Sequence, residues 1–436
     1  MELTRDALEQ HWLPFSNNRE FKREPRLFVS ASGMYYWSQH GKKILDGSSG
    51  LFTTPAGHCR PEIADAVGKQ LHTLDFTPSF MRGHPGAFAL ANAVAALTPK
   101  DLKHIFFCNS GSEAVDTAIK IALAYHLARK EAQRTYLVSR ERAYHGVNMG
   151  GTALSGMVKN REAFGAVMPG VLHLRHTLLP ANRMTRGMGA SGIELADDLL
   201  RFVQLVGEKR IAAVFVEPIA GSTGVLVPPV GYLERIREIC DRYGILLVFD
   251  EVICGFGRTG EPFAATSFGV TPDLITMAKA LTNGAQPMGA VAVRDGIYRT
   301  IIDAAPEGAT EFFHGYTYSA HPAACAAGLA TLKIYEDEDL FGKGRELSPY
   351  FLDAMFGLQD LAVMSDVRGY GLLAGIEVKA GKAPGVRGAE LQAKLFDRGL
   401  HVKTTGDVAI IAPAFIASRA EIDLMSDILR DALSEY

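Results

Sequence analysis

The chain has 436 residues, of which 47% are hydrophobic and 21% are charged, and its formal net charge is −3. This size and composition are typical of a globular protein with a large buried core. The near balance of charges gives no electrostatic reason to expect a nucleic acid or an anionic membrane as partner. The five cysteines are scattered and form no C-x-x-C pair, so the sequence indicates neither a disulfide framework nor a structural zinc site.

The N-terminus, MELTRDALEQHW, contains acidic residues and lacks the apolar segment of a signal peptide. No window of the chain reaches the roughly 18 apolar residues that a membrane helix needs. The histidines His84, His314 and His321 flank glycine or proline and show no metal-ligand spacing. We therefore expect a cytoplasmic protein that binds small molecules and no metal.

Short apolar runs alternate with amphipathic segments through the middle of the chain. This alternation predicts strands at 104–109, 134–139, 212–219, 245–252 and 273–280. It predicts helices that begin at Glu113 and that span 231–244. Because the runs are apolar on both faces, they favour an α/β fold with a parallel sheet buried between helices, whose ligands bind beyond the carboxyl ends of the strands.

The last part of the chain has a different pattern. From about residue 320 it contains a long predicted helix, 321–338, then two strand-like runs, 371–378 and 408–413, and a closing helix at 419–435. We interpret this part as a smaller α+β domain.

The stretch ILLVFDEVICGFGRTG, residues 245–260, allows three hypotheses. A nucleotide hydrolase would need a G-x-x-x-x-G-K-[ST] loop, and none of the four Gly-Lys pairs belongs to one. A dinucleotide-binding turn would need Gly255, Gly257 and Gly260 to open a helix, but EPFAATSFGVTP follows, with two prolines and no helical period. The third hypothesis makes Asp250 one half of a site whose other half lies elsewhere.

Two residues can complete that site. Glu217, Asp250 and Lys279 lie near the ends of successive predicted strands, 33 and 29 residues apart, so they can converge at one edge of the sheet. A desolvated lysine has a lowered pKa, and its neutral amine forms Schiff bases with aldehydes. Pyridoxal 5′-phosphate needs such a lysine together with an acid at its ring nitrogen, and these roles suit Lys279 and Asp250.

The segment NSGSEAVDTAIKIALAYHLA, from residue 109, provides a phosphate pocket, because Ser110, Gly111 and Ser112 lie at the mouth of a predicted helix. Taken singly, these residues could form an ordinary helix cap, Lys279 could be a surface lysine and Asp250 an ion-pair partner. Tyr144 and His145 could form a polar turn or stack on a ring. Their occurrence together and in this order favours the cofactor site.

Seven segments, in order, resemble the fold-type I, class III aminotransferases, most closely the ω-amino acid:pyruvate transaminases. They are LDGSSGLFTTPAGHCRPEI, FFCNSGSEAVDTAIKIA, RAYHGVNMGG, FVEPIAGSTGV, ILLVFDEVICGFGRTG, TMAKALTNG and FHGYTYSAHP. The resemblance implies a large domain, 56–318, that binds pyridoxal phosphate on a mostly parallel sheet flanked by helices. The small α+β domain, 319–436, would include the N-terminal segment 1–55. It also implies a homodimer, or a higher oligomer, with active sites at the interface.

The resemblance also assigns roles to residues. Lys279 would hold the cofactor, Asp250 its ring nitrogen, and Val252 and Tyr144 the two faces of its ring. The other residues expected to bind the cofactor are Ser110, Gly111, Ser112, His145, Glu217 and, for the neighbouring subunit's phosphate, Thr317. The glycines of GFGRTG would then form only the turn after the strand.

For the substrate, Phe52 and Phe80 match the positions of an aromatic wall, next to Tyr144. Members that use ornithine or 4-aminobutyrate have a glutamate where Ser222 stands, so Ser222 favours the branch that uses pyruvate. Lys403 stands where the family has an arginine that binds the substrate carboxylate. Because lysine lacks the planar fork of arginine, either Lys403 binds that carboxylate more weakly or another cation, such as Arg82, binds it.

The expected activity is transfer of an amino group from an ω-amino acid or primary amine to a keto acid, with pyruvate as the expected acceptor. The freed Lys279 would move the proton in each half-reaction. Two alternatives stay open at this point. A mutase, racemase or decarboxylase would share Lys279 and Asp250, and a protein of the same fold could bind the cofactor without catalysis.

Overall fold

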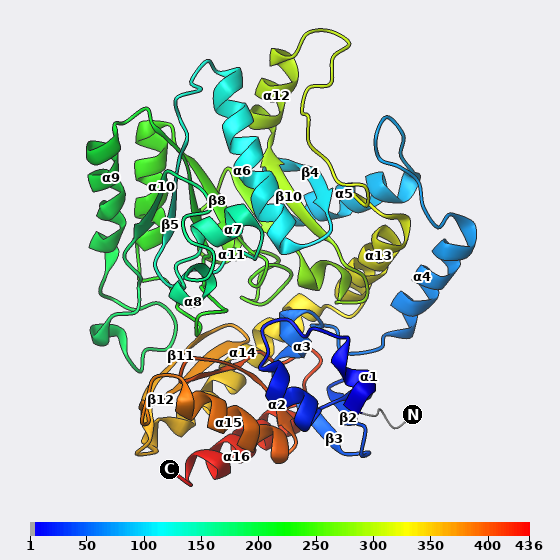
Figure 1. The fold of residues 1–436 in the computed structure, drawn as a ribbon, viewed down its shortest axis with the longest axis vertical. Helices are drawn as coiled ribbons and strands as arrows, with labels where there is room; N and C mark the ends of the chain where they lie inside the picture. Colours follow the sequence, from blue (N-terminus) through cyan, green and yellow to red (C-terminus); the bar gives the residue numbers. More distant parts are fainter. Residues whose placement is uncertain (1–4) are drawn as a thin grey trace.

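The computed structural model describes residues 5–436; the first four residues of the predicted segment 1–55 and of MELTRDALEQHW lie outside this range. Figure 1 shows a larger unit built around one sheet, above a smaller unit that contains both chain ends. Within residues 5–436, no helix is both long and apolar enough to cross a membrane.

The larger unit contains a seven-stranded sheet of order β4-β10-β9-β8-β7-β5-β6. Its strands are β4 (Leu102–Cys108), β5 (Tyr136–Arg140), β6 (Val171–Leu174), β7 (Ile211–Val216), β8 (Leu246–Asp250), β9 (Leu274–Met277) and β10 (Gly289–Arg294). Only β10 runs antiparallel to its neighbours, while the β9-β8-β7-β5-β6 part is parallel throughout. The predicted α/β fold with a mostly parallel sheet is confirmed.

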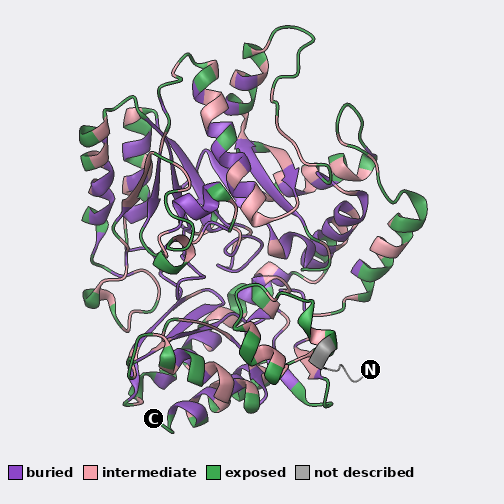
Figure 2. Cartoon of the chain, in the orientation of Figure 1, coloured by how far each residue is buried: buried purple, intermediate pink, exposed green. Residues whose placement is uncertain are grey.

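Helices cover both faces of this sheet, and every residue of β7, β8 and β9 is buried. Figure 2 shows the central strands of the larger unit mostly in purple, the colour of buried residues. This burial explains why the strands read as unbroken apolar runs. The helices of this unit are α4 (Pro61–Thr73), α5 (Pro85–Leu97), α6 (Gly111–Ala128), α7 (Met149–Leu154), α8 (Val158–Arg161), α9 (Asp198–Val206), α10 (Tyr232–Tyr243), α11 (Ala264–Ser267), α12 (Asp295–Ala304) and α13 (Pro322–Asp337). Helix α6 begins two residues before the predicted Glu113, because Ser110 caps it by accepting a hydrogen bond from the Glu113 amide.

The smaller unit contains two four-stranded sheets, of order β1-β2-β3-β13 and β11-β12-β15-β14. Their strands are β1 (Phe28–Ser32), β2 (Tyr35–Ser38), β3 (Lys43–Asp46), β11 (Met364–Tyr370), β12 (Leu373–Val378), β13 (Leu400–His401), β14 (Lys403–Thr405) and β15 (Val408–Ile411). The helices are α1 (Arg5–Glu9), α2 (Asn18–Arg23), α3 (Ser49–Phe52), α14 (Leu340–Phe356), α15 (Val386–Asp397) and α16 (Arg419–Leu433). Strand β13 pairs in parallel with β3, so the N-terminal and C-terminal parts of the chain contribute to one sheet. The domain boundaries at 55/56 and 318/319 stay predictions.

The site is positioned by three neighbouring strands. β7, β8 and β9 are adjacent and parallel, with Val216 paired to Phe249 and Asp250 paired to Thr276. Their carboxyl ends therefore meet at one edge of the sheet. Glu217 directly follows β7, Asp250 ends β8, and Lys279 lies two residues beyond β9.

Candidate active site

A cavity of about 330 Å³ opens at this edge, between the strand ends and the start of α6. Nine of the residues predicted from the sequence line it: Ser110, Gly111, Ser112, Tyr144, His145, Glu217, Asp250, Val252 and Lys279. They come from five separate segments of the chain. Within residues 5–436, no three His, Cys, Asp or Glu side chains gather as metal ligands would.

Asp250 is buried, and both oxygens of its carboxylate have hydrogen-bond partners. One oxygen, Oδ2, lies 2.8 Å from Nδ1 of His145. The other, Oδ1, accepts hydrogen bonds from the Val252 amide at 3.2 Å and the Thr276 hydroxyl at 3.1 Å. These contacts to both oxygens fix the orientation of the carboxylate. The geometry suits an acid that holds a proton on a cationic partner.

Lys279 opens a short 3₁₀ turn, Lys279–Thr282, and has a φ of 50°. Such a conformation is costly for a residue with a side chain and persists only where surrounding contacts hold it. Burial lowers the pKa of its amine to about 8, despite the opposing pull of Asp250 and Glu217, and the nearby Lys403 lowers the pKa further. A substantial neutral fraction is therefore present near pH 8, as a nucleophilic amine requires.

Glu217 holds in place residues that lie beside Asp250 and Lys279. Burial raises the pKa of its carboxyl to about 7. The carboxyl accepts a hydrogen bond from the Tyr144 amide at 3.0 Å, and Arg140 donates to the Glu217 carbonyl at 2.9 Å. Glu217 thus fixes the backbone at Tyr144, whose ring borders the cavity.

The start of α6 forms a cradle for an anion. The helix has 18 residues, and its first N–H groups and dipole favour negative charge at this end. A Cβ added to Gly111 would lie 3.0 Å from both methyl groups of Val252, and one on Gly146 would lie 2.5 Å from the Ser112 hydroxyl. Larger side chains would therefore fill the cradle. The backbone groups, the neutral lysine and the engaged acid together fit pyridoxal phosphate.

The glycines of GFGRTG and the nearby Glu251 have structural roles. Gly257 and Gly260 have φ of 103° and 92°, which side-chain-bearing residues rarely adopt, and no helix starts at them. Glu251 accepts hydrogen bonds from the amides of Ala264 and Ala265, at 2.6 and 2.8 Å, and so caps α11. The dinucleotide-binding hypothesis is excluded, as the sequence indicated.

Two predicted substrate residues lie next to each other, outside the cavity lining. The Nζ atom of Lys403, on β14, lies 5.8 Å from the ring centroid of Phe52. Burial lowers the pKa of Lys403, while Glu217 opposes this shift. Phe52 is itself buried, and Thr53 is the residue of this segment that lines the cavity.

Three other predicted residues lie elsewhere on the chain. Arg82 lines a separate surface depression and donates to the Met81 carbonyl at 2.7 Å. Phe80 is exposed and abuts Gly315, where an added Cβ would lie 2.9 Å from its ring. Thr317 is also exposed. The structure does not bring these three into the cavity of their own chain.

Sequence reasoning missed ten residues that line the cavity: Thr53, Asn109, Gly146, Ile253, Ala278, Thr282, Gly284, Gln286, Pro287 and Met288. Five directly adjoin predicted residues and the other five, within 282–288, follow Lys279 closely, so proximity in the sequence could have found them. Thr53 also had this signal, because it directly follows the predicted Phe52, although its segment reaches the cavity only through tertiary contacts.

The sequence model of the family described as Aminotransferase class-III matches residues 17–433. The chain is 53% identical over 430 residues to an omega-aminotransferase of Caulobacter vibrioides, covering 98% of both chains. It is 49% identical to a beta-alanine–pyruvate aminotransferase of Pseudomonas aeruginosa, covering 98% of this chain and 96% of that one. The crystal structure of an omega transaminase from Pseudomonas jessenii in complex with PMP matches with a TM-score of 0.93 and 29% identity, covering 100% of this chain and 98% of that chain. The chain therefore belongs to the class-III aminotransferases, which are transaminases that use pyridoxal phosphate.

Proposed function

We propose that this transaminase moves an amino group from an ω-amino acid or primary amine to pyruvate in two half-reactions. One observation carries the proposal: Lys279, Asp250 and the start of α6 border a single cavity of about 330 Å³. The relative from Pseudomonas aeruginosa, named for β-alanine and pyruvate, supports the choice of substrates.

Bound pyridoxal phosphate supplies an aldehyde that links to amines and an electron-withdrawing ring that stabilises negative charge at the substrate carbon. In this proposal the first N–H groups of α6 and the Ser112 hydroxyl hold the phosphate. Asp250, oriented by His145, keeps a proton on the ring nitrogen. Val252 and Tyr144, which line the cavity, would contact the two faces of the ring. The neutral amine of Lys279, released when the donor takes its place, would accept the proton from the substrate carbon and deliver it to the former aldehyde carbon of the cofactor. In the second half-reaction it would move a proton in the opposite direction.

Lys403 is the cation that we assign to the acceptor carboxylate. In the described part of the chain its ammonium forms no hydrogen bond or salt bridge, although it lies mostly buried near Glu217 and Lys279. The residue that would neutralise it in relatives using other substrates is replaced by Ser222. An unpaired, partly desolvated cation gains most from an incoming carboxylate. Arg82 cannot serve this cavity from its own chain, because it lines a different depression.

The direct test supplies the holoenzyme with pyruvate and a panel of β-alanine, taurine, a polyamine and benzylamine. The proposal expects alanine to form with at least one donor, measured by chromatography. Absence of alanine across the panel would contradict it. A product that keeps its nitrogen would instead identify a mutase or racemase, and released carbon dioxide would identify a decarboxylase.

We also infer that two copies of the chain assemble around their cavities. Large apolar side chains are exposed along 76–88 and 313–318: Phe76, Phe80, Met81, Phe88, Phe313 and Tyr318. The two segments are adjacent, because the rings of Phe76 and Tyr318 lie 5.9 Å apart. An apolar surface of this kind is typical of a protein interface. Phe80, Arg82 and Thr317 lie on it, so in the dimer they serve the partner's cavity.

Mixed dimers test this arrangement. Lys279→Ala and Thr317→Ala subunits, each weakly active alone, are combined by unfolding and refolding. If Thr317 acts across the interface, each mixed dimer contains one site with both native residues, and activity recovers to about half of wild type per mixed dimer. No recovery would place Thr317 in the site of its own chain. The cytoplasmic location expected from the sequence stays a prediction.

A further inference from the structure

Residues 46–59 join β3 to α4 with an unusual backbone. Five of them have positive φ: Ser49 (48°), Gly50 (68°), Phe52 (64°), Gly57 (84°) and Cys59 (54°). Three of the five carry side chains larger than alanine, for which this conformation costs on the order of 1 kcal/mol or more each. The segment therefore depends on restraints from its surroundings. It also contributes Thr53 to the cavity and Phe52 to the contact with Lys403.

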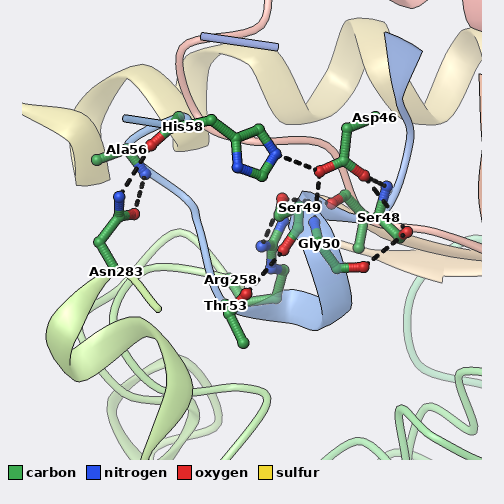
Figure 3. A network of polar contacts seen from close by, with 11 residues as sticks. Asp46, Ser48, Ser49, Gly50, Thr53, Ala56, His58, Arg258 and Asn283 are labelled. Atoms are coloured by element: carbon green, nitrogen blue, oxygen red, sulfur yellow. Dashed lines mark hydrogen bonds and ion pairs between the residues drawn. The ribbon is translucent and has the colours of Figure 1, made fainter. Parts of the chain in front are cut away.

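The first restraint comes from within the segment. The Asp46 carboxylate accepts hydrogen bonds from the Ser48 amide at 3.0 Å, from the Gly50 amide, and from Nε2 of His58 at 2.8 Å. Figure 3 shows these three donors converging on Asp46. Because His58 lies twelve residues beyond Asp46, this carboxylate ties the start of the segment to its end.

The second restraint holds the start of the segment against the rest of the protein. The Ser49 hydroxyl donates to the Ala412 carbonyl at 2.7 Å and accepts from Arg258 at 3.3 Å. Arg258 belongs to the GFGRTG turn after β8 and is buried, which lowers the pKa of its guanidinium to about 10. This end of the segment is thus fixed to both units of the chain.

The third restraint comes from Asn283 and reaches the other end of the segment. Its Oδ1 accepts a hydrogen bond from the Ala56 amide at 3.0 Å, and its Nδ2 donates to the Gly57 carbonyl at 2.9 Å. In Figure 3 the Asn283 amide points directly at this backbone. One buried side chain therefore satisfies a donor and an acceptor of a segment that lies 226 residues away.

Asn283 itself belongs to a second strained segment, the turn that begins at Lys279. Lys279, Asn283 and Gly284 have φ of 50°, 49° and 70°. The two segments approach closely, since a Cβ added to Gly284 would lie 3.1 Å from Cβ of Thr53. The Asn283 side chain thus joins the lysine turn to residues 56–57 of the segment that contributes Thr53 to the cavity.

We propose that Asn283 is a positioning residue that sets the spacing between Lys279 and the cavity-lining Thr53, together with its buried neighbour Phe52, and thereby the preference among amine donors. This inference rests on the proposed function. Asparagine suits the role because it tolerates a positive φ and carries a donor and an acceptor on one short side chain. Aspartate has the same shape but no N–H, and it would place a carboxylate oxygen against the Gly57 carbonyl.

The test compares Asn283→Asp with a matched control, Asn182→Asp. Asn182 also forms a paired contact, in which Nδ2 donates to the Ser191 carbonyl at 2.7 Å and Oδ1 accepts from the Ser191 amide at 3.2 Å, but it lies outside the cavity lining. Asn283→Gly is made as well, because glycine keeps the positive φ and removes both hydrogen bonds. The same measurements are made on Asn283→Gly if Asn283→Asp does not fold.

Two measurements do not depend on turnover. Hydrogen exchange of peptides covering 53–58 and 279–286 is expected to be about tenfold faster in Asn283→Asp and unchanged in Asn182→Asp, because a buried carbonyl loses its donor. Bound pyridoxal phosphate is then titrated by its absorbance. The pH midpoint of this titration is expected to move by about 0.3 unit or more as Lys279 changes its surroundings.

The kinetic measurement separates positioning from simple stability. In Asn283→Asp, kcat with β-alanine is expected to fall about fivefold, because Thr53 and Phe52 are held less firmly relative to Lys279. For the same reason, the ratio of kcat/KM for benzylamine over β-alanine is expected to rise about threefold. Faster exchange with an unchanged absorbance midpoint, kcat and donor ratio would overturn the proposal, and so would unchanged exchange. If the wild-type enzyme makes no alanine, the proposed function fails, while exchange and the absorbance midpoint still decide the role of Asn283.

Discussion

The two halves of the cavity are built in different ways. The cofactor half comes from strand ends and one helix start within a single sheet, with Asp250 and Lys279 after neighbouring strands. In our proposal, the substrate half brings together the cavity-lining Thr53 with its neighbour Phe52 from the N-terminal part, Lys403 from the C-terminal part, and residues of a second copy. Groups fixed by a hydrogen-bonded sheet keep their spacing, whereas loops can change without disturbing it. We therefore expect substitutions in the substrate half to change donor choice more than they change the chemistry.

The strongest test of the cofactor half is Lys279→Ala. Loss of the amine that binds the cofactor and moves the proton is expected to reduce alanine formation by at least about a thousandfold. Circular dichroism and the oligomeric state should match those of wild type. Borohydride treatment should fix the cofactor covalently to the wild-type lysine, read by peptide mass spectrometry, and leave the variant unlabelled. Residual turnover within tenfold of wild type would remove Lys279 from the mechanism.

Next in size is Asp250→Asn, compared with its neighbour Glu251→Gln. Asparagine cannot supply the charge that would keep a proton on the ring nitrogen, so kcat of Asp250→Asn is expected to fall roughly a hundredfold. Glu251 caps α11 and does not line the cavity. Glu251→Gln should therefore lower Tm but keep kcat within about threefold of wild type. Equal losses of kcat in both variants would contradict the separate roles of the two acids.

The substrate half is tested by Lys403→Ala. Loss of a hydrogen bond to a charged group is expected to raise KM for pyruvate about tenfold, with a much smaller change in KM for benzylamine, which has no carboxylate. Lys403→Arg should restore pyruvate binding. Lys43→Ala is the control, because Lys43 also lies over an aromatic ring, 3.6 Å from the Tyr35 centroid, but away from the cavity. An unchanged KM for pyruvate in Lys403→Ala would point to a cation from the partner subunit.

The smallest expected effect concerns stability and Glu217. Burial raises the pKa of this carboxyl from 4.5 to about 7. The protonated form therefore favours the folded state fully below pH 4.5, and this contribution is lost as the pH rises through 7. Glu217→Gln should match the wild-type Tm below pH 4.5 and exceed it by about 2 °C or more at pH 8. Calorimetry across this range checks the prediction, and parallel Tm curves would contradict it.

Much of the cofactor half could be predicted because its residues follow apolar runs that form buried parallel strands. Asp250 and Lys279 are one strand apart in both sequence and space, so their convergence follows from connectivity. The antiparallel strand β10 was not predicted, although it brings Gly289 against the Ser110 carbonyl, 2.3 Å from where a Cβ would lie. Pairing direction depends on long-range contacts that a local pattern does not encode.

The sequence by itself determined the cofactor chemistry, because strand periodicity, the helix start at Ser110 and the order of Asp250 and Lys279 are local or regularly spaced features. Only the tertiary structure decided how the remaining residues act. It joined Asn283 to residues 56–57, placed Lys403 over Phe52, and left Phe80, Arg82 and Thr317 outside the cavity of their own chain. The physical reason is that these contacts close between segments far apart in the chain, where spacing along the sequence carries no information about distance in space.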